Sequence, residues 1–124
     1  SSAIAFEEIL NQKCIGSPPV FDLILLGLGE DGHTASLFPF TSALKVTDKW
    51  ATTSKGKGCD RITLTAPVLS AATKVIFLVS GASKQIALKR LMDPSESPDR
   101  TPAKLVQPFD EILVLADQAA LNLV

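Results

Sequence analysis

His33, the one histidine among 124 residues, has two carboxylates close to it in the sequence, Glu30 and Asp31. An unperturbed imidazole titrates at about pH 6.5, so a histidine can take up and release a proton near neutral pH. Asp31 could orient the ring or stabilise its charged form, and Glu30 is the weaker candidate for that role. These residue types predict general acid–base chemistry with His33 and Asp31 as the catalytic pair.

Three glycines surround this pair, and Gly27, Gly29 and Gly32 have the G-x-G-x-x-G spacing of a dinucleotide-binding turn. The two acidic residues inside the turn oppose that interpretation, because they would repel a pyrophosphate. Pro39 also ends the following helix after about two turns, too early for a βαβ crossover. No strand ending in an acid follows about 20 residues later to hold a ribose. We expect the glycines to allow close approach of a different ligand and to offer backbone N–H groups to an oxyanion.

A plainer interpretation makes the segment a tight strand-to-helix turn in which Asp31 and Thr34 are caps. His33 would then be an ordinary polar residue, as most histidines are. Its uniqueness, the carboxylates beside it and its place after a strand favour chemistry over this interpretation.

The glycine turn follows an unalternating apolar run at residues 22–28, which is typical of a parallel strand buried on both faces. Similar runs at 74–80 and 112–116 predict two more strands of this kind. The strands should be parallel neighbours, and sites in such sheets lie beyond the C-terminal ends of the strands.

Helices are expected to alternate with these strands. One covers roughly the first dozen residues, where Phe6, Leu10 and Cys14 repeat with Ile9 beside them. Others are expected over 34–37, from Lys84 to about Met92, and over 118–124 with Asp117 as the cap. The alternation predicts an α/β, Rossmann-like layered fold with a mainly parallel sheet.

A hairpin is expected between residues 50–54 and 61–65, around Lys55-Gly56-Lys57-Gly58. Ile62 and Leu64 would face the core, with Arg61, Thr63 and Thr65 on the other side. The proline-rich segment 93–102 is predicted to be an exposed loop. We interpret Lys55, Lys57, Lys89 and Arg90 as solvated surface charges.

Composition excludes several classes of function. Twelve basic and 13 acidic residues give a net charge of −1, without the basic excess of a nucleic-acid binder. The apolar run Leu23–Leu26 is too short to span a membrane, and the first residues lack the pattern of a signal peptide. Cys14 and Cys59 lie far apart and form no C-x-x-C pair, so a zinc or dithiol site is not supported and a reducing cytoplasm is the simpler expectation.

The segment from Phe21 to Pro39, Phe-Asp-Leu-Ile-Leu-Leu-Gly-Leu-Gly-Glu-Asp-Gly-His-Thr-Ala-Ser-Leu-Phe-Pro, resembles the signature of the 6-phosphogluconolactonase family. The related glucosamine-6-phosphate deaminases share Gly-x-Gly-x-Asp-Gly-His but typically continue to Asn-Glu-Pro rather than Ser-Leu-Phe-Pro. Residues 61–65 resemble the family's Arg-Ile-(Ser/Thr)-Leu-Thr strand, and residues 81–84 resemble its Gly-x-x-Lys turn. The resemblance runs from about residue 3 to the end.

The resemblance implies a cytoplasmic hydrolase of the pentose phosphate pathway, which converts 6-phospho-D-glucono-1,5-lactone to 6-phosphogluconate without a metal or a cofactor. His33 would activate the attacking water with help from Asp31. Lys84, at a helix N-terminus, and Arg61 would bind the phosphate. The substrate, a phosphorylated sugar lactone, would contact these residues and Gly27, Gly29, Glu30 and Gly32.

The family's Gly-Gly-(Ser/Thr)-x-Pro phosphate loop and its Asp-Glu-Arg segment are not in this sequence. We therefore expect residues 1–124 to be a single partial domain, the C-terminal half, with the missing N-terminal half as its partner and neither nucleic acid nor membrane as a partner. Two other functions stay open: an amino-sugar-phosphate isomerase or deaminase, and an inactive fragment that binds sugar phosphates.

Overall fold

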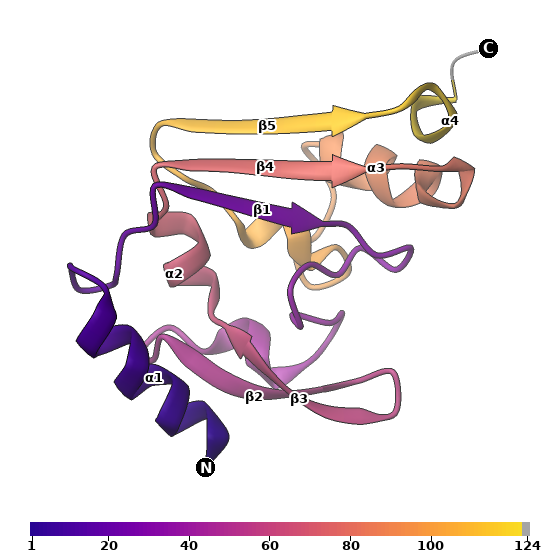
Figure 1. Ribbon diagram of the computed structural model, residues 1–124. Coiled ribbons are helices and arrows are strands. Elements are labelled where there is room, and N and C mark those ends of the chain that lie inside the picture. Colours follow the sequence, from indigo (N-terminus) through magenta and orange to yellow (C-terminus); the bar gives the residue numbers. More distant parts are fainter. Residues whose placement is uncertain (123–124) are drawn as a thin grey trace.

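The computed structural model describes residues 1–122 (Figure 1). Within them the helices and strands follow one another in this order: α1 (Ser2–Lys13), β1 (Leu23–Gly27), β2 (Ala51–Gly56), β3 (Cys59–Leu64), α2 (Ala66–Ala71), β4 (Lys74–Val79), α3 (Gln85–Met92), β5 (Glu111–Ala116) and α4 (Gln118–Leu121). Short 3-10 helices lie at Ser42–Lys45, Ala82–Lys84 and Pro102–Leu105. None of the described helices is long and apolar enough to cross a membrane.

A parallel sheet in the order β1-β4-β5 forms the upper layer of the molecule. Its register places Leu25 beside Ile76, and Ile76 beside Leu113. All three strands end on the same side of the molecule, where their arrowheads point in Figure 1. The predicted α/β fold with a parallel sheet is confirmed, and the turns after β1 and β4 lie at the C-terminal end of the sheet.

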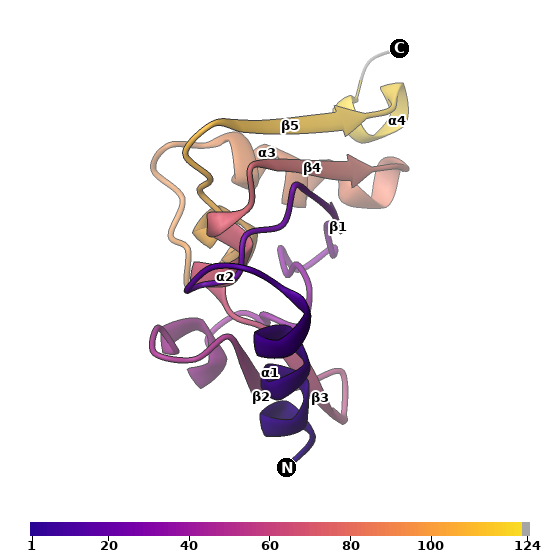
Figure 2. The ribbon, with the colours of Figure 1, turned by 60° about the vertical axis from the view of Figure 1, so that its left-hand side comes forward.

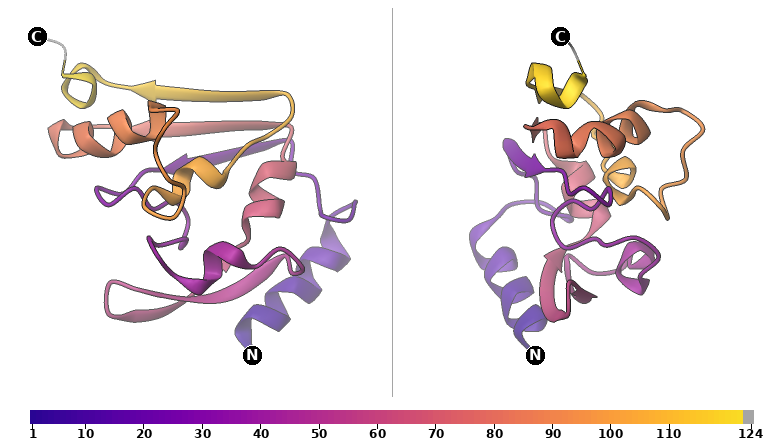
Figure 3. Two further views of the ribbon diagram at one scale, coloured as in Figure 1. Left: turned by 180° about the vertical axis from the view of Figure 1, so that it is seen from behind. Right: turned by 90° about the vertical axis from the view of Figure 1, so that its right-hand side faces the viewer.

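Only one face of this sheet is covered by residues 1–122. Helix α3 and the segment 93–106 lie over it (Figure 3), and Val75, Phe77 and Val79 point into that interior with at most 3% of their surface exposed. Successive side chains of a strand point to opposite faces. On the other face Leu25 and Leu115 are 57% and 54% exposed. The prediction that these strands are buried on both faces is therefore wrong for this chain, whose described elements cover one face.

The hairpin β2–β3 forms a second layer below β1. Gly56 pairs with Cys59, and Lys57 and Gly58 between them have φ of 56° and 76°. Two successive positive φ values are those of a type I′ turn, whose twist suits a two-residue hairpin. Helix α1 packs against the hairpin (Figure 2), and the Glu7 carboxylate accepts a hydrogen bond of 2.7 Å from the backbone N–H of Trp50. The predicted hairpin is confirmed.

Two local expectations are wrong. Residues 34–37 form no helix, because Ala35 has φ of +50° and a β-bridge joins Thr34 to Leu37. In β3 the faces are exchanged: Thr63 is 3% exposed and Ile62 is 40% exposed. The buried Thr63 hydroxyl accepts a hydrogen bond from the backbone of Ser36, so packing against that segment decides which face of the strand is covered.

Other predictions are only partly right. The segment 93–102 is a loop, but Glu96 and Thr101 within it are buried. Asp117 caps the last helix by accepting a hydrogen bond of 2.8 Å from the N–H of Ala120. That helix ends at Leu121, and the expected residues 123–124 lie outside the described part of the chain. Helix α2 was not expected. In α1 Leu10 is buried as predicted, whereas Ile9 is exposed.

Candidate active site

His33 and Asp31 form a closely bonded pair in the turn that follows β1. Their Nδ1 and Oδ1 atoms are 2.5 Å apart, and the same Oδ1 accepts a hydrogen bond of 3.0 Å from the backbone N–H of His33. Both side chains are partly buried, with 24% of His33 and 35% of Asp31 exposed. Burial alone would raise the pKa of Asp31, but the hydrogen bonds from His33 and the charges of His33 and Lys57 outweigh it and lower that pKa. Asp31 is therefore an ionised acceptor that holds one nitrogen of the imidazole.

Gly29 and Gly32 make this arrangement possible for different reasons. A Cβ added to Gly29 would overlap the Nδ1 and Cε1 atoms of His33 and would lie 2.8 Å from Asp31 Oδ1. Gly32 has φ of +89°, a conformation that favours glycine, and a Cβ there would lie 3.0 Å from Thr101 Cα. The Gly29 N–H donates to the His33 carbonyl and the Gly32 N–H donates to the Gly29 carbonyl. These two N–H groups hold the turn together and are already engaged.

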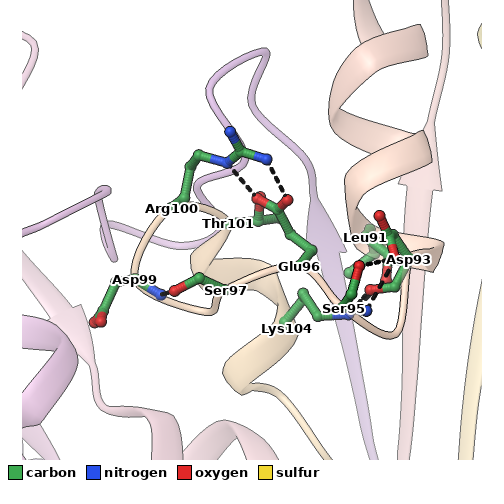
Figure 4. A network of polar contacts seen from close by, with 9 residues as sticks. All are labelled: Leu91, Asp93, Ser95, Glu96, Ser97, Asp99, Arg100, Thr101 and Lys104. Atoms are coloured by element: carbon green, nitrogen blue, oxygen red, sulfur yellow. Dashed lines mark hydrogen bonds and ion pairs between the residues drawn. The ribbon is translucent and has the colours of Figure 1, made fainter.

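The segment 93–106 supports the turn from below through a buried carboxylate, that of Glu96 (Figure 4). Two guanidinium nitrogens of Arg100 donate to its two oxygens at 2.7 and 2.5 Å, and the Thr101 hydroxyl donates to it at 2.7 Å. Hydrogen bonds from Arg100 and then Thr101 lower the pKa of Glu96 to about 2. Thr101 contacts Gly32, whose carbonyl accepts a 3.1 Å hydrogen bond from Ala103 N–H. The network therefore fixes the backbone beneath the candidate pair.

A hollow of about 420 Å³ opens beside the pair at the C-terminal end of the sheet. Its walls come from β1, the glycine turn and the start of α3: Leu25, Leu26, Gly27, Leu28, Gly29, His33, Thr34, Ala35 and Lys84. The carbonyl of Gly27 is held by the buried Thr34 hydroxyl at 2.8 Å. His33 and Lys84 therefore lie at the same end of the sheet, as the sequence predicted.

Lys84 stands at the junction of the 3-10 turn Ala82–Lys84 and helix α3. An ammonium group and a helix N-terminus in one place suit an anion such as a phosphate. The preceding turn is bound to Asp117, which accepts hydrogen bonds from the Ser80 hydroxyl and the Gly81 N–H. The pKa of Asp117 is lowered first by the hydrogen bond from the Ala120 N–H and then by those from Ser80 and Gly81. The Gly81 N–H is thus occupied, and Lys84 is the cation that faces the hollow.

Arg61 reaches the site from the hairpin, where its guanidinium carbon lies 5.8 Å from the centre of the Phe38 ring. His33 also lies beside that ring, at a distance of 4.6 Å between ring centres. Lys57, which we expected to be a solvated surface charge, has its Nζ 3.9 Å from Asp31 Oδ2 and is still 54% exposed. Glu30 is exposed, and Asp31 rather than Glu30 contacts the imidazole.

The structure thus brings the predicted Gly27, Gly29, His33 and Lys84 to one hollow, with Asp31 bonded to His33. Arg61 does not line the hollow, but it lies near the Phe38 ring that contacts His33. Sequence reasoning missed Phe38 and Glu96. Phe38 lay inside the family signature, but its partners Arg61 and Gly56 are distant in sequence. The sequence did contain one signal for Glu96, namely Arg100 four residues after it. Pairs of opposite charge at this spacing are common on protein surfaces, so the signal did not indicate a buried carboxylate.

Comparisons with known proteins identify the family of the chain and agree with its fold. The sequence matches the family of glucosamine-6-phosphate isomerases/6-phosphogluconolactonase over residues 1–115. A curated 6-phosphogluconolactonase of Synechocystis sp. is 51% identical over 105 residues, which cover 85% of this chain and 44% of that protein. One from Nostoc sp. is 43% identical over 122 residues, which cover 96% of this chain and 51% of that protein.

Among solved structures, the 6-phosphogluconolactonase of Trypanosoma brucei has a TM-score of 0.81 and 28% identity, and the match covers 97% of this chain and 51% of that one. The chain spans about half the length of the curated relatives it matches. The match over residues 1–115, the sequence identities and the shared fold show that the chain belongs to the glucosamine-6-phosphate isomerase/6-phosphogluconolactonase family.

Proposed function

We propose that the protein to which this chain belongs hydrolyses 6-phospho-D-glucono-1,5-lactone to 6-phosphogluconate. The observation that carries the proposal is that His33, bonded to Asp31 at 2.5 Å, lines one hollow together with Lys84. Hydrolysis of a phosphorylated lactone requires a base to activate water and a cation to bind the phosphate, and both lie here at one end of the sheet. The lactonase names of the relatives and the Ser36–Pro39 ending of the signature support this substrate over an amino-sugar phosphate.

The proposed reaction begins with a water molecule beside His33. In the proposed mechanism the Nδ1–H group of the imidazole donates a hydrogen bond to the Asp31 carboxylate, which leaves Nε2 as the basic nitrogen. Nε2 takes a proton from the water as the oxygen attacks the lactone carbonyl, and the carbonyl oxygen becomes an oxyanion. The ionised Asp31 stabilises the imidazolium that forms, because opposite charges attract strongly in a partly buried site.

The tetrahedral intermediate then collapses. The bond between the carbonyl carbon and the ring oxygen breaks, and the imidazolium returns its proton to that oxygen, which becomes the hydroxyl of the open sugar acid. The N–H groups of Gly29 and Gly32 are engaged within the turn. Donors to the oxyanion therefore have to come from other N–H groups, and we propose those of the turn between Gly27 and Gly32.

Lys84 is proposed to bind the phosphate together with the N-terminus of α3. Arg61 is proposed as a second phosphate ligand, because its side chain is exposed and its guanidinium can form two parallel hydrogen bonds to a phosphate. Gly27, Gly29, Glu30 and Gly32 are proposed substrate contacts, of which Gly27 and Gly29 line the hollow.

We further propose that residues 1–124 form part of one larger domain, and that the remainder covers the open face of the sheet. The charged Lys74–Glu111 pair lies at the end where the strands begin, and exposed leucines occupy that face on all three strands: Leu23, Leu25, Leu78, Leu113 and Leu115. A patch of this kind on a sheet marks a packing surface. The cytoplasmic location is also a proposal, which the free thiols of Cys14 and Cys59 support.

The experiment is an assay of the full-length protein with the phosphorylated lactone, corrected for spontaneous hydrolysis. His33→Ala should lower turnover about a hundredfold or more, the usual loss for a general base. Lys89→Ala, an exposed change on α3, serves as the matched control and should leave the rate unchanged. Normal turnover by His33→Ala would refute the mechanism. Release of ammonia from glucosamine-6-phosphate without lactone hydrolysis would refute the function.

A further inference from the structure

Phe38 is an apolar residue that the proposed chemistry does not use, yet it contacts two of the proposed site residues. Its ring is 5% exposed, and its centre lies 4.6 Å from that of the His33 ring, with the two planes tilted by 35°. The guanidinium carbon of Arg61 lies 5.8 Å from the same ring centre. The Phe38 ring is therefore a neighbour of both the proposed base and a proposed phosphate ligand.

Gly56, on strand β2 of the hairpin, provides the space for this ring. A Cβ added to Gly56 would overlap Phe38 Cδ2 and would lie 2.5 Å from Cε2 and Cγ. Gly56 is not in the left-handed region, so glycine is needed there for space and not for backbone conformation. The hairpin backbone thus presses directly against the ring.

Two hydrogen bonds hold the hairpin and the Phe38 segment in a fixed relation. The Ser54 hydroxyl donates to the Ser36 carbonyl at 2.5 Å, and the Ser36 N–H donates to the Thr63 hydroxyl at 3.2 Å. Ser54 and Thr63 are buried, and one lies on each strand of the hairpin. The ring cannot slide along the hairpin while these bonds are intact.

We propose that Phe38 is a positioning residue, seated on Gly56, that fixes the imidazole of His33 against Asp31 and sets the position of Arg61 relative to it. The hairpin β2–β3 is then part of the active site rather than a neighbouring layer. This inference rests on the proposed function for its effect on turnover. Its geometric content, the dependence of His33 on a hairpin glycine, is independent of the reaction.

The kinetic test compares Phe38→Leu, Gly56→Ala and the double variant in the full-length protein. The added Cβ must push the ring by more than about 0.9 Å to restore an ordinary contact of 3.4 Å, because Cδ2 is closer still than Cε2 and Cγ. Displacements of that size strongly slow a positioned reaction. We expect each single variant to lose about tenfold or more in kcat. Leucine at position 38 leaves room for the methyl group of Gly56→Ala. The loss of kcat in the double variant should therefore be much smaller than the product of the losses in the two single variants. The double variant also covers the case in which Gly56→Ala alone folds poorly.

Lys55→Ala, an exposed change next to Gly56 on the same strand, is the control and should behave as wild type. Full activity in Gly56→Ala would overturn the proposal. A loss of kcat in the double variant that equals the product of the two single losses would also overturn it. The ratio of rates on phosphorylated and unphosphorylated lactone should also fall in Phe38→Leu, because Arg61 loses its support. An unchanged ratio would remove Arg61 from the proposal.

A spectroscopic measurement separates this inference from the proposed function. His33 is the only histidine of residues 1–124. In the full-length protein its imidazole nitrogen resonances are assigned as those that disappear in His33→Ala. Phe38→Leu and Gly56→Ala should shift these resonances as the Nδ1–Asp31 hydrogen bond loosens, whereas Lys55→Ala should not. Altered resonances in a protein without lactonase activity would refute the function and keep the inference. Unaltered resonances in an active lactonase would refute the inference and keep the proposed function.

Discussion

The substitution Gly29→Ala tests whether the reaction requires the position of His33 that the glycine turn allows. The added Cβ would overlap two atoms of the imidazole and lie 2.8 Å from Asp31 Oδ1. An ordinary contact is 3.4 Å or more, so the carboxylate would have to withdraw by about 0.6 Å and the ring by more. The Nδ1–Oδ1 bond of 2.5 Å cannot keep its geometry if its two partners move apart.

A misplacement of about 1 Å in a reacting group can cost roughly a hundredfold in rate. We therefore expect kcat of Gly29→Ala in the full-length protein to fall about a hundredfold. The KM should change less, because the proposed phosphate contacts come from Lys84 and Arg61 on other elements. Initial rates of acid release from the phosphorylated lactone give both constants, and a thermal melt shows that the variant is folded.

The effect should depend on the imidazole. In a His33→Ala background the new methyl group no longer meets the ring, so Gly29→Ala should add little to a loss already present. Near-normal turnover in Gly29→Ala, with the fold intact, would refute the claim that this glycine positions the base. Losses that multiply in the double variant would also refute it, since the methyl group would then be acting elsewhere.

Three further predictions concern the phosphate, the buried carboxylate and the open sheet face. Lys84→Ala and Arg61→Ala should each weaken use of the phosphorylated lactone about 10–100-fold, the scale of a charged hydrogen bond, and spare the unphosphorylated one; equal losses on both would contradict a phosphate role. The pKa of Glu96 is about 2 when folded and ordinarily 4.5, so its contribution to stability is complete above pH 4.5 and is lost as pH falls through about 2. Thermal melts over this range should drop more steeply for wild type than for Glu96→Gln; parallel curves would count against the network. Residues 1–124 expressed alone should bind a hydrophobic dye and associate, whereas a monomer with full lactonase activity would show the open face to be harmless.

The parts of the fold that the sequence predicted are those set by local patterns. The unalternating apolar runs correctly marked β1, β4 and β5 as neighbours in one parallel sheet. The hairpin could be predicted because its turn, Lys57-Gly58, contains a glycine and no β-branched residue. Both turn residues have positive φ, which a β-branched residue rarely adopts. His33 and Asp31 were found because a two-residue spacing on a turn brings their side chains together whatever the rest of the chain does.

The parts that the sequence did not predict depend on contacts between distant segments. Periodicity placed Ile62 on the core side of β3, but the hydroxyl of Thr63 finds its partner at Ser36, 27 residues away, and that face is the buried one. Three prolines and several charges around Glu96 suggested an exposed loop. Glu96 can nevertheless be buried, because two nearby residues pair with its carboxylate. The Arg100 guanidinium balances its charge and donates hydrogen bonds to it, and the Thr101 hydroxyl donates another.

The same division applies to the candidate site. The family signature is one continuous stretch, and it contains the proposed base, its carboxylate, the glycine beneath them and the aromatic ring beside them. The residues that hold these groups in place lie outside it: Gly56 behind Phe38 and Thr101 behind Gly32. A signature of this kind identifies the chemistry, because the reacting groups share one turn. In the proposed mechanism the positions of these groups also depend on the hairpin and on the segment 93–106. We therefore expect substitutions at Gly56 or Thr101 to impair a site whose signature is intact.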